Sequence, residues 1–117
     1  MMNITDKTDD ELLAIANPLW SHLVHASNIG KYGEFVKYFS AELVIGLNEI
    51  EVGKQFANSE LTRNLSESIE FIGTIRRGEY VTVLYRQRSK KSEGEWLGRL
   101  VLGYEEDEVK IFGASIF

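Results

Sequence analysis

The chain has 117 residues and a formal net charge of −5; 44% of its residues are hydrophobic and 26% are charged. This length and composition are typical of one globular domain, residues 1–117, and the acidic balance argues against a nucleic-acid partner because phosphate binding needs a basic surface. The absence of cysteine excludes disulfides and thiolate chemistry and argues against structural zinc. The acidic N-terminus is unlike a secretory signal and no apolar run has the length of a membrane span, so we expect a cytoplasmic protein without membrane contact.

Residues 1–7 are predicted to be a flexible tail, followed by a helix. Thr8 and Glu11 have the spacing of a capping box. Apolar residues then recur at helical spacing: Leu12, Leu13, Ile15, Ala16, Leu19, Trp20, Leu23 and Val24. Pro18 interrupts this stripe, so we expect either a kink or a helix that begins only near Asn17. His22 and His25 have no third ligand near them in sequence and are interpreted as surface residues, not as a metal site.

A second, shorter helix is predicted over Tyr32–Phe39, after a break at residues 28–30. The run ELVIGL, Glu42–Leu47, is interpreted as a short strand. Asn48 with Glu51 resembles another capping box and predicts a third helix through Ala57. For residues 58–68, a helical turn and an extended lead into the next strand remain alternatives.

Four runs rich in β-branched and aromatic residues follow, and they predict four strands: Ile69–Arg76, Glu79–Ser89, Glu95–Tyr104 and Val109–Phe117. Their short connections indicate an antiparallel meander. The fold class is therefore α+β: a cone-shaped, curved antiparallel sheet covered on one face by about three N-terminal helices.

Pairing that follows the turns places Tyr85 opposite Glu70 and Leu100, and Leu100 opposite Gly113. The second face is then too apolar to leave in water. We expect it to form a homodimer, through residues that include Arg86, Arg99, Phe71, Leu84, Val101 and Phe112. This register puts Arg86 directly across from Arg99, an unfavourable pair that calls for a partner's carboxylate or a bound anion between them. Two alternatives stay open: both arginines splay to solvent, or the faces are inverted and the arginines form the floor of a cavity for an acidic ligand.

The order of elements resembles the nuclear transport factor 2-like superfamily, which includes ketosteroid isomerases and polyketide cyclases. The most similar stretch is NIGKYGEFVKYFSAEL, residues 28–43, which resembles the family's joint between the first two helices and the first strand. The matching residues are Asn28, Gly30, Phe35, Val36, Phe39 and Glu42, whereas Lys31 replaces the usual aspartate. The closing stretch EWLGRLVLGYEEDEVKIFGASIF also resembles the family's final hairpin.

The resemblance implies a cone with a pocket, but not the isomerase activity. Isomerases of this fold use a tyrosine on the first helix, an aspartate base after the first strand and an acid on a late strand. These positions fall on Leu23, near Leu47, and within Trp96–Leu100, which contains no carboxylate. A leucine can neither transfer a proton nor donate to a developing enolate, so isomerase chemistry is not expected.

The residues predicted to line a small, mostly apolar cavity without a cofactor are Trp20, Tyr32, Glu70, Tyr85, Gln87, Trp96 and Ser115. The alternative is that Glu70 and Gln87 touch water at the sheet edge and the aromatic rings are ordinary core. Three functions follow from this, and the first is ranked above the other two. The first is a dimeric, non-catalytic module that binds a small, partly apolar molecule. The second is a cyclase-, isomerase- or hydratase-type enzyme using Glu70 and Tyr85 as an acid/base pair, and the third is a protein-interaction module of the immunity or scaffold type.

Two observations distinguish these functions. A closed cavity into which Glu70 and Tyr85 both point, with a raised carboxylate pKa, would indicate the enzyme. A filled core with an exposed aromatic groove would indicate the interaction module.

Overall fold

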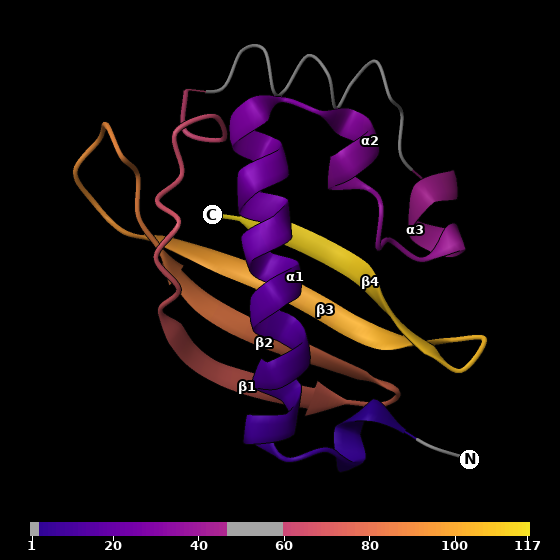
Figure 1. The fold of residues 1–117 in the computed structure, drawn as a ribbon. Coiled ribbons are helices and arrows are strands. Elements are labelled where there is room, and N and C mark those ends of the chain that lie inside the picture. The colour runs from indigo at the N-terminus through magenta and orange to yellow at the C-terminus, as the bar shows by residue number, and fades with distance from the viewer. Residues whose placement is uncertain (1–2, 47–59) are drawn as a thin grey trace.

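The computed structural model describes residues 3–46 and 60–117, which form an α+β fold (Figure 1). After a short 3-10 turn, η1 (Ile4–Asp6), come the helices α1 (Asp9–Ile29), α2 (Tyr32–Phe35) and α3 (Ala41–Ile45). The strands are β1 (Phe71–Arg77), β2 (Tyr80–Gln87), β3 (Trp96–Glu105) and β4 (Glu108–Ile116), which form one curved antiparallel sheet in chain order. None of the helices in these stretches is both long and apolar enough to cross a membrane.

Helix α1 is the element that covers the sheet. It crosses one face, whereas α2 and α3 lie toward β4 (Figure 1). The predicted capping box is confirmed, because the Thr8 hydroxyl accepts from the Glu11 N–H and the Glu11 carboxylate accepts from the Thr8 N–H. Pro18 lies inside this single 21-residue helix, so a start near Asn17 is wrong.

The N-terminal segment is not a flexible tail in residues 3–7. Ile4 is completely buried in the core, and the Asn3 side chain accepts a hydrogen bond from the Thr5 N–H at the start of η1. Burying a whole isoleucine side chain contributes about 1.5–3 kcal/mol, which favours the docked segment over a frayed one. One isolated isoleucine has no periodicity, so the sequence pattern gives no sign of this contribution.

The stretch between α1 and residue 46 differs from expectation in two respects. The second helix is only Tyr32–Phe35, and Glu42–Leu47 is not a strand, because α3 spans Ala41–Ile45. The Ser40 hydroxyl accepts from the Leu43 N–H and starts α3. In this stretch the chain pairs with the sheet through a one-residue bridge between Phe39 and Ile111. The predicted helix Asn48–Ala57 and residue Leu47 lie outside the described residues.

Asn28 connects the end of α1 to the segment that leads into the sheet. Its side-chain amide donates to the Leu65 carbonyl at 2.9 Å, and its side-chain oxygen accepts from the Leu65 N–H at 2.8 Å. Leu65 is 2% exposed and pairs with Ser89 in an isolated bridge. Two alternatives were open for residues 58–68, a helical turn and an extended lead into the first strand. The described residues 60–63 form turns, and the segment that follows them is extended.

The four predicted strands are confirmed, but the predicted register is wrong. Tyr85 lies opposite Gly98 and not Leu100, a two-residue shift that preserves the faces. Two β-bulges change the assignment of side chains to faces. The first lies in β1, between Phe71 and Gly73, and the second lies in β4, opposite Val101 and Leu102 of β3. Each inserts an extra residue, so the side chains beyond it change face.

The sheet therefore has an inner face, which α1 covers, and an outer face. The inner face carries seven completely buried side chains: Val81, Val83, Tyr85, Gln87, Leu100, Leu102 and Ile111. They pack with Leu12, Ala16, Trp20 and Leu23 of α1 to form the core. The outer face carries Ile75, Tyr80, Leu84, Arg86, Leu97, Arg99, Val101, Phe112 and Phe117. Phe71, predicted on the outer face, lies opposite Tyr85 and therefore belongs to the inner face.

Candidate functional site

Three of the predicted cavity residues meet beneath α1, where they contact one another. The rings of Trp20 and Tyr85 are stacked, with centroids 5.0 Å apart and planes inclined by 16°. The Trp20 indole N–H donates to the Gln87 side-chain oxygen at 3.1 Å. Trp20 is 3% exposed, and both Tyr85 and Gln87 are 0% exposed. These side chains fill the space between helix and sheet themselves.

The polar atoms of this cluster are bonded within the protein. The Gln87 amide nitrogen donates to the carbonyls of Ser66 at 2.7 Å and Arg88 at 2.9 Å, and the Tyr85 hydroxyl donates to the Asn17 side-chain oxygen at 2.9 Å. Burial raises the pKa of Tyr85, so the phenol stays neutral. A fully bonded buried network stabilises a unique core arrangement and leaves no free donor for a ligand. Asn17, which sequence reasoning did not single out, is the partner that allows Tyr85 to be buried.

Gly98 makes the close approach of Trp20 possible. A Cβ at this position would lie 2.4 Å from Trp20 Cζ2, closer than any van der Waals contact allows. Gly98 lies opposite Tyr85 on β2, so the indole covers both the glycine and the tyrosine ring. The bare backbone of β3 thus forms the hollow that receives the helix.

Glu70, the proposed acid or base, lies away from this cluster. The first bulge turns it to the side of the outer face, where its carboxylate accepts from Arg88 Nε at 2.7 Å and lies 3.9 Å from Arg86. The hydrogen bond from Arg88 lowers the pKa of Glu70. An enzyme of the predicted kind would need this carboxyl beside Tyr85 with a raised pKa. The structure separates the two residues and shifts the pKa in the opposite direction.

Of the other predicted residues, Trp96 lies beside this cluster on the inner face, whereas Tyr32 and Ser115 lie elsewhere. Tyr32 is half-buried at the start of α2, and Trp96 pairs with Gln87 at the start of β3, with its ring 3.6 Å from a Cβ built on Gly94. The second bulge places Ser115 opposite Arg99, on the outer face. The seven residues therefore do not form one site.

The histidines serve as polar surface contacts. His22 Nε2 is within hydrogen-bonding distance of the Glu34 carbonyl oxygen, and His25 lies 3.5 Å from a carboxylate oxygen of Glu67. In residues 3–46 and 60–117 there is no group of three or more metal-ligating side chains.

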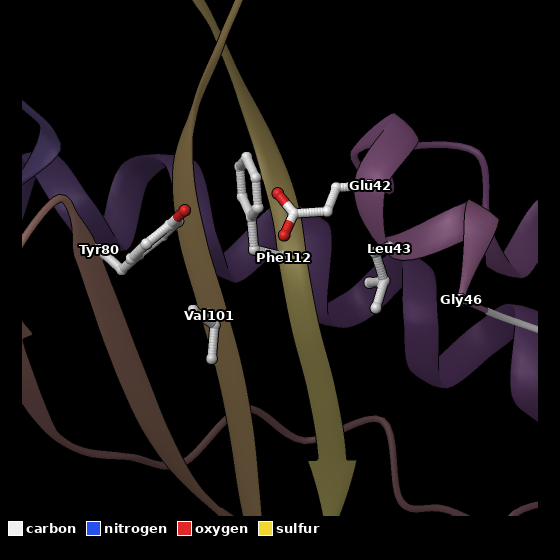
Figure 2. A pocket seen from close by; sticks show the side chains of 6 residues that line it. All are labelled: Glu42, Leu43, Gly46, Tyr80, Val101 and Phe112. Atoms are coloured by element: carbon white, nitrogen blue, oxygen red, sulfur yellow. The ribbon is translucent and has the colours of Figure 1, made fainter.

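An exposed aromatic groove lies on the outer face, beside α3 (Figure 2). Tyr80 of β2 and Phe112 of β4 meet edge to face, with ring centroids 5.1 Å apart, although β3 runs between their strands. They meet there because Gly103 has no side chain: a Cβ on Gly103 would lie 2.8 Å from the Tyr80 ring. The groove has a volume of about 400 Å³ and is also lined by Glu42, Leu43, Gly46 and Val101. In Figure 2 the Glu42 carboxylate extends beside the Phe112 ring, toward Tyr80.

The two arginines of the outer face do not oppose each other. Arg86 lies opposite Leu97, and Arg99 lies opposite Leu84. The negative group that Arg86 needs comes from its own chain, because Glu95 lies 2.7 Å from its guanidinium. Arg99 lies over the Phe117 ring at 5.4 Å and forms no ion pair with any residue that the structure describes.

Gly98→Ala should destabilise the protein by about 1–3 kcal/mol, because the new methyl group overlaps the Trp20 ring and one of the two must move. Gly73→Ala is the matched control, since a Cβ at Gly73 meets nothing within 4 Å. Urea unfolding measures both. Equal stability of Gly98→Ala and the wild type would mean that the Trp20 ring does not pack against Gly98.

The pKa of Glu70 should lie below its ordinary value of 4.5 and return toward it in Arg88→Gln. A carboxyl whose pKa is lowered on folding stabilises the native state above pH 4.5, and this stabilisation is lost as the pH falls through the native pKa. NMR titration of the side-chain carboxyl carbon measures both values. Arg77→Gln, which removes an arginine at the opposite end of β1 from Glu70, should leave the titration unchanged. Identical Glu70 curves in the wild type and Arg88→Gln would contradict the assigned cause.

A comparison with models of known protein families finds no match, and a comparison with curated proteins finds no significant similarity. The functional interpretation therefore depends on geometry: the packed Trp20–Tyr85–Gln87 cluster beneath α1 and an exposed aromatic groove on the opposite face.

Proposed function

We propose that this chain is a protein-interaction module that associates with itself through the outer face of its sheet. The observation that carries the proposal is the apolar exposure of this face. Ile75 is 47% exposed, Leu97 37%, Tyr80 38% and Phe117 65%. Large contiguous apolar patches on soluble proteins usually mark contact sites. A second copy would cover all four side chains at once.

The packing of the interior also favours an interaction module over a ligand-binding cavity or an enzyme. Trp20, Tyr85 and Gln87 occupy the space that the cavity hypothesis reserved for a ligand, and their hydrogen bonds are satisfied. The acid/base hypothesis needs Glu70 beside Tyr85, whereas Arg88 holds Glu70 on the other side of the sheet. A filled core with an exposed aromatic groove is the combination expected of an interaction module.

A small, partly apolar molecule bound in the groove is the second candidate. Its support is the volume of about 400 Å³, within the range of ligand sites, and a lining of two aromatic rings and one carboxylate. This candidate keeps the binding function expected from the sequence but moves it from the interior to the outer face.

We also propose a relationship to the nuclear transport factor 2-like superfamily and a cytoplasmic location. Support for the relationship comes from a curved meander covered by an N-terminal helix, and from Asn28, which bonds to Leu65 at the joint. The departure is α3, which occupies the position where the family's first strand would begin.

The wild-type protein should be a dimer at micromolar concentration, and Ile75→Lys should make it monomeric, because a charge in an apolar interface is costly to desolvate. Ile29→Lys is the matched control: Ile29 is 42% exposed but lies at the end of α1, away from the outer face. Size-exclusion chromatography with light scattering gives the masses, and circular dichroism verifies folding. A wild-type monomer at about 100 μM would refute the proposal, and NMR shifts of Tyr80 and Phe112 on adding benzyl alcohol would then favour the ligand candidate.

A further inference from the structure

The outer face has two chemically different ends. At one end lie the Tyr80–Phe112 aromatic pair and the Glu42 carboxylate, with Glu105 nearby, where it accepts from the Ala41 N–H at 2.9 Å. At the other end Arg99 lies over the Phe117 ring. Beside β4 this face therefore carries two carboxylates at one end and a guanidinium at the other, while Arg77, opposite Tyr80, and Lys110, opposite Gly103, add positive charge at the first end.

Glu42 and Arg99 have no ionic partner among the described residues, and the same holds for Arg77, which lies opposite Tyr80 on β1. Arg86 is paired with Glu95, Arg88 with Glu70, and Lys110 with Glu108. In contrast, Glu42, which is exposed, and Arg99, which is half-buried, form no ion pair with any residue in the described stretches 3–46 and 60–117. The charges of Glu42 and Arg99 are opposite in sign and border the same apolar surface.

The register fixes how far apart these groups lie along β4. Phe112, beside Glu42, and Phe117, beneath Arg99, are five residues apart, or roughly 16 Å of strand. When two sheets pack face to face, a two-fold axis across the strands reverses their direction, so each end of one face meets the opposite end of the other. An axis midway between Phe112 and Phe117 would bring Glu42 of each copy toward Arg99 of the other. The glutamate and arginine side chains together are long enough to span the usual gap of about 10 Å between packed sheets.

The area of the face favours an interface that includes α3. Four strands spaced by about 4.8 Å, each about eight residues long, give a sheet face of roughly 500 Å² in projection. A stable interface buries about 800 Å² on each partner. The groove between α3 and the sheet would contribute much of the remainder, and it contains Glu42.

We infer that two copies of this chain pack outer face to outer face about a two-fold axis that crosses the strands, with Glu42 of each copy paired to Arg99 of the other. The inference rests on the proposed self-association and specifies its geometry. An axis parallel to the strands would instead place like ends together, so that Glu42 and Arg99 would not meet.

Charge reversal tests this geometry directly. Glu42→Arg alone creates two arginine–arginine pairs in the dimer, and Arg99→Glu alone creates two glutamate–glutamate pairs, so each variant should dimerise at least about tenfold more weakly than the wild type. Mixing the two variants should give a heterodimer in which both pairs are again of opposite sign. The double variant Glu42→Arg/Arg99→Glu should likewise dimerise within a few-fold of the wild type. Analytical ultracentrifugation gives the dissociation constants, and Glu34→Arg on α2 is the control for an unrelated charge reversal.

The outcomes separate this inference from the proposed function. Weak single variants that recover on mixing support the two-fold axis across the strands. A wild-type dimer that Ile75→Lys disrupts, but in which mixing the charge variants restores nothing, would overturn the Glu42–Arg99 pairing and leave self-association intact. A monomeric wild type would overturn both.

Discussion

The packing of the Trp20 ring against the bare backbone of Gly98 is the contact on which the rest of the structure depends. The indole ring occupies the hollow that the glycine leaves, stacks on Tyr85 and donates to Gln87. A single aromatic side chain thereby fixes the position of α1 on the sheet and occupies the interior. These rings and amides use the space and the hydrogen bonds that a ligand at this position would need, which is why the proposed function lies on the other face of the sheet.

The outer face repeats this arrangement without a helix to close it. Gly103 is a second glycine in the same strand, and here two aromatic rings from the flanking strands meet over it. On the inner face the corresponding aromatic surface is 3% exposed or less, whereas Tyr80 remains 38% exposed. Strand β3 thus carries one glycine for each face, the first receiving the chain's own helix and the second lying beneath the exposed aromatic groove.

Periodicity in the sequence was sufficient to predict the helix from Thr8 and the four strands, because both depend on local apolar spacing. The assignment of faces failed at the bulges, since alternation cannot show where an extra residue is inserted; the glycines at positions 73 and 113, each inside a strand, were the available signal. Those bulges moved Glu70 and Ser115 out of the predicted site. Trp20, Tyr85 and Gln87 were correctly placed under the helix, but whether such residues line a cavity or fill it depends on packing distances that spacing does not encode.

The most direct test of this account is a dilution series followed by NMR, which shows which face of the sheet responds to association. The methyl and ring signals of Leu97, Val101 and Tyr80 should shift with protein concentration, while the Trp20 indole N–H and the Gln87 side-chain amide should stay constant. The opposite pattern, with concentration-dependent signals at Trp20 and Gln87 and a silent outer face, would contradict the claim that the interior is closed and that the outer face is where the protein makes its contacts.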